Sequence, residues 1–134
     1  MRDNETIQFA QKQLGKSFAW GTNDCNTLVC KYIDEVWGKD TLKIPFQNYN
    51  NKTGAIRFQK NYPKSLTEVI IDAGATKISS KLATVGDILI VDRKYFQLGH
   101  ICLGTNFLSV PENQKTAITR LLDFSIFDWA LRIN

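Results

Sequence analysis

The expected fold is organised around one stretch, Phe18-Ala-Trp-Gly-Thr-Asn-Asp-Cys25-Asn-Thr-Leu-Val-Cys-Lys-Tyr-Ile33. Its first half is rich in Gly, Asn and Asp and predicts a turn, whereas its second half has the apolar spacing of a helix. Cys25 therefore stands where the helix should begin. Because the first N–H groups of a helix lack internal partners and carry partial positive charge, we expect a thiolate to be stabilised there. Cys25 is our candidate nucleophile.

Helical patterns occupy the first half of the chain, and glycines end several of them. Asp24 or Asn23 is expected to cap the helix that carries Cys25, and Gly38 to end it. Ser65-Leu-Thr-Glu68 has the form of a capping box and predicts another helix start. We expect helices over residues 4–14, 24–37, 54–61 and 66–73.

After Gly74 the apolar pattern changes to that of strands. Strands are expected over residues 75–78, 86–92, 98–103, 106–110, 116–122 and 129–133. Gly104-Thr105 fits a two-residue type II′ hairpin turn. The layout predicts an α+β fold, with N-terminal helices followed by an antiparallel β-sheet arranged as a meander, in one domain spanning residues 1–134.

The composition is that of an ordinary globular protein: 134 residues, 43% hydrophobic and 22% charged, with a net charge of +4. The longest apolar run is only a few residues, so no membrane insertion is expected. The N-terminus lacks the apolar core of a signal peptide. We therefore expect synthesis in a cytoplasm and, if the protein works outside the cell, export by another route.

Residues 41–67 contain no acid and five bases, Lys43, Lys52, Arg57, Lys60 and Lys64. Such a basic stretch suits an anionic polymer, either nucleic acid or a bacterial cell wall, and is equally compatible with a solvated loop face. For nucleic acid, the stacking groups would be the aromatic residues of the same region. These are Phe46, Tyr49, Phe58 and Tyr62.

The three cysteines, Cys25, Cys30 and Cys102, have no metal-like spacing, and the chain has a single histidine. We therefore expect no zinc site and no other metal or cofactor. Cys25 and Cys30 stand about 140° apart around a helix, which argues against a disulfide between them. Cys30 and Cys102 are interpreted as small buried hydrophobic residues.

Cysteine catalysis needs a base and a group that orients it. The base can only be His100, at the start of an expected strand. With the hairpin turn at Gly104-Thr105, His100 falls opposite Ser109, which is therefore the candidate orienting residue. If the strand register slipped by one residue, the orienting residue would be Glu112 or Asn113 instead. A cysteine at a helix start and a histidine in a strand are each more often structural, but their joint occurrence favours catalysis.

Three motifs occur in order: Phe-Ala-Trp-Gly-x-x-Asp-Cys at 18–25, Gly-Asp-Ile-Leu-Ile-Val at 86–91 and Gly-His-Ile-Cys-Leu-Gly at 99–104. Together they resemble the NlpC/P60 papain-like cysteine peptidases, especially the short versions found in bacteriophage genomes, often near tail genes. The last strand, 127–133, is similar too. The resemblance implies a papain-like α+β fold that cleaves peptide bonds in peptidoglycan stems, commonly next to a D-amino acid.

Residue by residue, the resemblance implies that Cys25 is the nucleophile and His100 the general base. Asp24 matches the aspartate before the nucleophile, and Trp20 matches the turn that leads into it. We place Trp20, Asp24 and Asn26 on the substrate side; Trp20 as a core residue is an equally good interpretation.

Family members often carry a tyrosine two residues before the tryptophan, where this chain has Phe18. The oxyanion would therefore rely on the backbone N–H of Cys25 and another donor.

The favoured function is a cysteine endopeptidase that acts on bacterial cell-wall peptides when a phage enters or leaves its host. Its partners would be peptidoglycan stem peptides and other phage tail proteins, with the protein attached to the virion. A first alternative is a tail component that keeps the fold without useful turnover. A second, disfavoured alternative is a basic nucleic-acid-binding module.

Overall fold

The computed structural model describes residues 2–44, 48–94, 96–112 and 115–134. Within these ranges the chain forms four α-helices and one six-stranded antiparallel sheet, as the α+β prediction requires. The helices are α1 (Asp3–Gln13), α2 (Cys25–Trp37), α3 (Lys52–Asn61) and α4 (Leu66–Asp72). The strands are β1 (Ala75–Ile78), β2 (Ile88–Asp92), β3 (Gln97–Cys102), β4 (Asn106–Ser109), β5 (Ile118–Leu121) and β6 (Trp129–Ile133).

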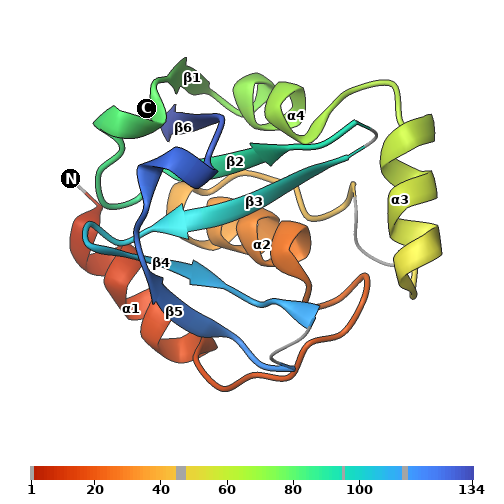
Figure 1. Ribbon diagram of the computed structural model, residues 1–134, viewed down its shortest axis with the longest axis horizontal. Coiled ribbons are helices and arrows are strands. Elements are labelled where there is room, and N and C mark those ends of the chain that lie inside the picture. The colour runs from red at the N-terminus through yellow and green to blue at the C-terminus, as the bar shows by residue number, and fades with distance from the viewer. Residues whose placement is uncertain (1, 45–47, 95, 113–114) are drawn as a thin grey trace.

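In Figure 1, α2 lies behind the sheet and is seen between β3 and β4, and α3 lies on the side of the molecule away from both termini. Helix α2 begins at Cys25 with Asp24 as its N-cap, and it ends at Gly38 in a left-handed conformation with φ +69°. Ser65 and Glu68 form the expected capping box of α4. The helix limits predicted from caps and glycines are therefore confirmed to within a few residues.

The order of the strands differs from the predicted meander. It is β1-β6-β2-β3-β4-β5, so only β2 to β5 follow one another, and the last strand lies between the first two. Burial gives the reason: Ala130 and Leu131 of β6 are both fully buried, whereas in β1 only Ala75 is buried. A strand that is apolar on both faces belongs inside a sheet, and a half-exposed strand can form its edge.

Two apolar clusters cover the two faces of the sheet. The larger cluster joins α1 and α2 to the sheet through residues such as Val29, Ile33 and Ile101. The smaller one lies on the opposite face and includes Leu89 and Phe127, with the short 3-10 helices η1 (Ser80–Leu82) and η3 (Phe124–Ile126) at its border. Side chains of successive strand residues therefore belong to different cores.

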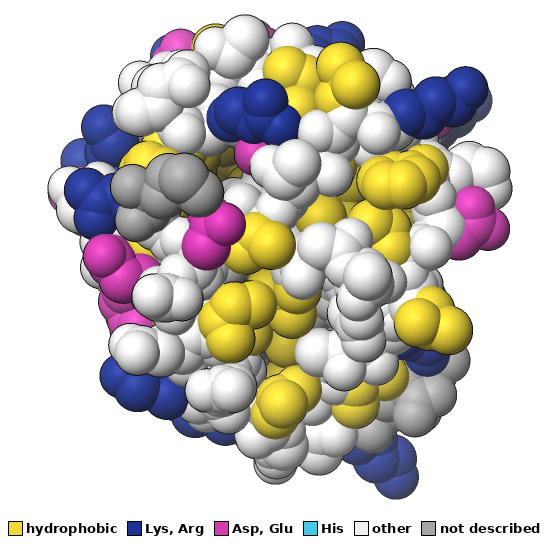
Figure 2. Space-filling model, turned by 90° about the vertical axis from the view of Figure 1, so that its left-hand side faces the viewer, with side chains coloured by type: hydrophobic (Ala, Val, Ile, Leu, Met, Phe, Trp, Pro, Cys, Tyr) yellow, Lys and Arg dark blue, Asp and Glu magenta, His cyan; other side chains and the backbone are white. Residues whose placement is uncertain are grey.

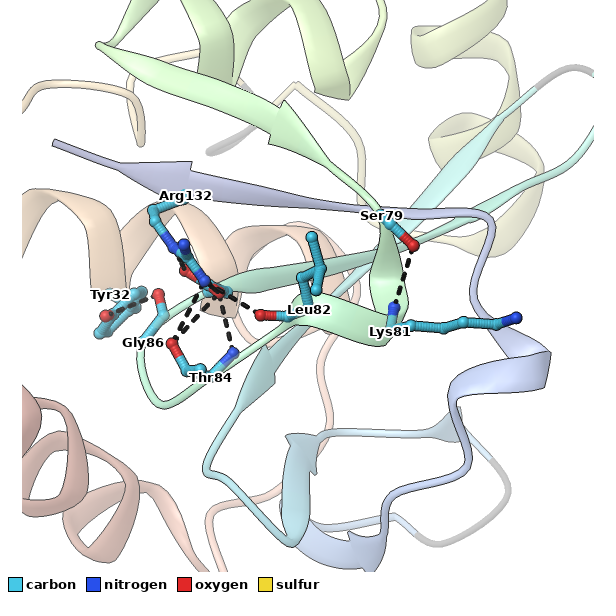
Figure 3. Close-up of polar contacts among 8 residues, drawn as sticks. Tyr32, Ser79, Lys81, Leu82, Thr84, Gly86 and Arg132 are labelled. Carbon is cyan, nitrogen blue, oxygen red and sulfur yellow. Dashed lines mark hydrogen bonds and ion pairs between the residues drawn. The ribbon is translucent and has the colours of Figure 1, made fainter.

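The turn that leads into β2 is held by polar contacts (Figure 3). The Arg132 guanidinium donates through Nη2 to the buried Asp87 carboxylate at 2.9 Å and to the Leu82 carbonyl at 3.1 Å. The Tyr32 hydroxyl donates to the Gly86 carbonyl at 3.1 Å and so joins the turn to α2. The Gly86-Asp87 motif thus serves the fold.

Figure 2 shows the side of the molecule that carries both termini, where hydrophobic side chains form patches across the middle of the face and most charged side chains lie near its margins. No helix within the described ranges is both long and apolar enough to cross a membrane.

Candidate active site

A cavity of about 320 Å³ opens at the start of α2. The loop before α2, the helix α3, and the strands β3 and β4 provide its walls, and most of its lining is apolar: Phe18, Trp20, Ile56, Phe96, Leu98 and Val110. All six residues that the sequence marked as site residues line it: Trp20, Asp24, Cys25, Asn26, His100 and Ser109. The fold therefore brings the candidate residues to one place.

Cys25 is the first residue of α2 and is half-buried. Its thiol donates to the Val110 carbonyl at 3.6 Å, and its Sγ lies 3.7 Å from the Ser109 hydroxyl. Both partners stand where β4 ends and the chain leaves the sheet. Ser109, expected to orient the histidine, thus places its hydroxyl against the thiol.

The expectation of an acidic thiol at Cys25 is wrong. Burial, the largest cause, raises the pKa of the Cys25 thiol above 9.0, and the charge of Asp24 raises it further, against a lowering by the Ser109 hydrogen bond. The helix start favours an anion, but the N-cap carboxylate beside it already supplies one. At neutral pH Cys25 therefore rests as a thiol.

Asp24 is buried, and its carboxylate accepts four hydrogen bonds from within the chain. Oδ1 accepts from the backbone N–H groups of Asn26 and Thr27, both at 3.0 Å. Oδ2 accepts from the Gly21 N–H and the Tyr49 hydroxyl, both at 2.8 Å. Asp24, predicted on the substrate side, lines the cavity, and its carboxylate holds together the segments around it.

Asn26 has a similar structural task. Its amide nitrogen donates to the Gln97 carbonyl at 2.8 Å, and its amide oxygen accepts from the Gly99 N–H at 2.9 Å. The side chain is buried and uses both ends of its amide on the backbone of β3. Asn26 thus fixes the start of α2 to β3.

His100 lies on the face of β3 opposite to the one that packs against the body of α2, and from there it lines the cavity together with Ser109 and Cys25. A Cβ added to the neighbouring Gly99 would meet Val29 of α2 at 3.0 Å, so the next residue points to the opposite face. There the imidazole packs edge-to-face against Phe107 and Phe127, with ring centroids 5.4 and 5.3 Å away.

The surroundings of His100 keep its imidazole neutral. Burial lowers the pKa of His100 from 6.5 to about 4, against a smaller opposing effect of a backbone hydrogen bond at Leu89. Nδ1 is buried and has no hydrogen-bond partner among the residues that the structure describes.

The predicted register of the hairpin that carries His100 is confirmed, because the Leu103 N–H donates to the Asn106 carbonyl across the turn and Ile101 pairs with Leu108.

Tyr49 is a site residue that the sequence reasoning assigned only to a nucleic-acid alternative. It lines the cavity and ties its own segment to the N-cap of α2 through Asp24. A Cβ at Gly21 would stand 1.9 Å from the Tyr49 carbonyl, so the two segments are in close contact. Gly21 also has φ +82°, which suits glycine. Tyr49 lies in a stretch without periodicity, which gave no signal for this role.

The basic stretch is partly neutralised and its rings contact one another. Lys43 lies 3.2 Å from Asp40, and Lys64 pairs with Asp72. Tyr49 and Tyr62 both pack against Phe58, with centroids 5.7 and 5.3 Å away. Two earlier candidates, Phe46 and Asn113, lie outside the described residues.

Comparisons with known proteins agree with this fold. The crystal structure of the NlpC/p60 domain of the peptidoglycan hydrolase SagA superposes with a TM-score of 0.68 and 19% identity, covering 99% of this chain and all of that one. The fold is therefore similar to that of an NlpC/p60 domain. No curated protein matches the sequence. Residues 2–126 match the model of a domain family of unknown function, DUF6950. The chain belongs to this domain family, DUF6950.

Proposed function

We propose that this chain is a cysteine hydrolase that cleaves the peptide stems of bacterial peptidoglycan. The observation that carries the proposal is the Cys25 thiol at the start of α2, in a mostly apolar cavity, within the fold of a peptidoglycan hydrolase domain. A helix start leaves backbone N–H groups for the developing oxyanion. The motif resemblance further supports a phage protein that acts as the phage enters or leaves its host.

In the proposed reaction, the Cys25 sulfur attacks the peptide carbonyl and its proton passes to the neutral His100 imidazole. The backbone N–H of Cys25, which already lowers the pKa of its own thiol, would stabilise the oxyanion. His100 would then protonate the leaving amine. Water, giving a proton to the same imidazole, would hydrolyse the thioester and restore the thiol.

The resting structure makes this proton transfer costly. Burial raises the pKa of the Cys25 thiol and lowers the pKa of the His100 imidazole to about 4, so a wide gap separates the two pKa values. Burial therefore opposes transfer of the proton from the thiol to the imidazole. Substrate binding would have to reduce this gap for useful turnover.

That gap supports a second candidate, a peptide-binding component of a phage tail with little or no turnover. It would use the same cavity but would not require proton transfer from Cys25. In both candidates residues 1–134 act as one domain, a proposal based on the sequence alone.

The test compares the wild-type chain with Cys25→Ala and Cys30→Ala on purified peptidoglycan and synthetic stem peptides, with mass analysis of the products. Cys30 is a buried cysteine of the same helix and controls for thiol loss without loss of the site. We expect cleavage by the wild type and Cys30→Ala, and none by Cys25→Ala. Cleavage that survives Cys25→Ala would refute the nucleophile.

Absence of cleavage by every form, with peptide binding retained, would favour the tail-component candidate. If the wild type does cleave, a His100→Phe variant tests whether the imidazole takes part. Undiminished turnover in this variant would exclude His100 as the base.

A further inference from the structure

A second hollow of about 410 Å³ adjoins the cavity that contains Cys25. It is lined by Trp20, Thr22, Asn48, Tyr49 and Asn50. Trp20 and Tyr49 line both spaces, so the two hollows share a wall made of two aromatic side chains. A polymeric substrate that occupies the first hollow would therefore extend naturally into the second.

The chemistry of this second hollow is that of a sugar site. Two aromatic rings offer flat apolar surfaces, and the Asn50 amide and the Thr22 hydroxyl offer hydrogen-bond donors and acceptors. A pyranose ring has the complementary surface, with an apolar face of C–H groups and a rim of hydroxyls. None of the lining residues carries a charge, which disfavours an anionic ligand.

The hollow is built between two segments that hold each other in place. The Tyr49 hydroxyl donates to Asp24, and the Tyr49 carbonyl lies against Gly21. The Trp20 ring is oriented by an edge-to-face contact with Phe18, with centroids 4.8 Å apart. The amide of Asn48 donates to the Ile44 carbonyl. A site whose side chains are already oriented loses little entropy when it binds.

We infer that this second hollow binds a sugar ring of the glycan strand while the stem peptide of the same molecule lies beside Cys25. The inference rests on the proposed peptidoglycan substrate. It specifies that substrate as a peptide still attached to its glycan.

The experiment uses the full chain with Cys25→Ala, so that bound substrate stays intact, and isothermal titration calorimetry. The two probes are one stem peptide in free form and the same peptide on an N-acetylglucosamine–N-acetylmuramic acid disaccharide. We expect the disaccharide-linked probe to bind about tenfold more tightly, as one or two additional hydrogen bonds would provide. Because the hollow is uncharged, this ratio should not change between low and high salt.

Thr22→Val and Asn50→Ala, added to Cys25→Ala, should each remove most of that advantage and leave the free peptide's affinity unchanged. Thr22 and Asn50 are exposed, so the fold should tolerate both changes. Asn61→Ala, at an exposed asparagine outside the hollow, is the matched control and should leave the tenfold ratio unchanged.

Equal affinities for the two probes would overturn the inference and leave the proposed peptide substrate in place. Failure of both probes to bind would overturn the inference together with the proposed function.

Discussion

The single histidine of this chain allows one electrostatic prediction to be tested without interference from other imidazoles. The His100 ring is buried against Phe107 and Phe127, and burial lowers its pKa from 6.5 to about 4. In the unfolded chain the same side chain titrates near its ordinary value. Between these two pH values the unfolded state binds a proton that the folded state does not.

The sign and size of the effect follow from this difference. Stability should be complete above about pH 6.5 and should fall as the pH drops towards 4, because protonation then favours the unfolded chain. The total loss from His100 is about 3 kcal/mol, of which about 2 kcal/mol is lost between pH 7 and pH 5. This loss is a large share of a typical domain's stability.

The assay is urea unfolding of the wild type and of His100→Phe at pH 7, 6 and 5. Phenylalanine keeps an aromatic ring beside Phe107 and Phe127 but cannot bind the proton, while the carboxylates titrate equally in both proteins. We expect the wild type to lose about 2 kcal/mol more than the variant between pH 7 and pH 5. Parallel losses in the two proteins would refute the argument, as would an imidazole proton resonance that titrates near pH 6.5 in the folded state.

Two further substitutions test how the start of α2 is built. Gly21→Ala should lower the free energy of unfolding by more than about 2 kcal/mol, because its Cβ would collide with the Tyr49 carbonyl. Gly15 has the same φ of +82°, but no atom of the described residues lies within 4 Å of a Cβ placed there, so Gly15→Ala should cost clearly less in the same urea unfolding experiment. Asp24→Asn removes a charge that raises the pKa of Cys25 and should speed its alkylation by iodoacetamide at pH 7 by about two- to fivefold; an unchanged rate would contradict the role given to that carboxylate.

Local signals in the sequence predicted the elements of this fold well. The Asp24 cap, the end of α2 at Gly38 and the hairpin around Gly104 each depend on a few neighbouring residues, and each was found as expected. The place of β6 between β1 and β2 was not predicted, because it depends on contacts between distant parts of the chain. The role of Tyr49 was missed for the same reason, since its partner Asp24 lies 25 residues away.

The candidate site shows a subtler limit of sequence reasoning. Strand alternation correctly predicted that His100 shares a face with Ser109, but it could not show that both residues would line one cavity with Cys25. Proximity to the thiol is set by where α2 meets β3, a tertiary feature fixed by the Asn26 side chain. The choice of His100 as the base came from its being the only histidine, which carries no information on distance.

The contacts of Asn26 show what catalysis by His100 would require. The Asn26 side chain hydrogen-bonds to the backbone of β3 on both sides of Leu98, which places Leu98 beside the start of α2. Leu98 lies on the same face of β3 as His100, and it lines the cavity. His100 is one strand repeat further on, among aromatic rings. To take the proton of Cys25 the imidazole would need solvent or substrate contacts that offset its burial and raise its pKa from about 4 towards 6.5. Hydrolysis by Cys25 and His100 therefore requires a bound substrate that causes this pKa shift, whereas peptide binding alone does not require it.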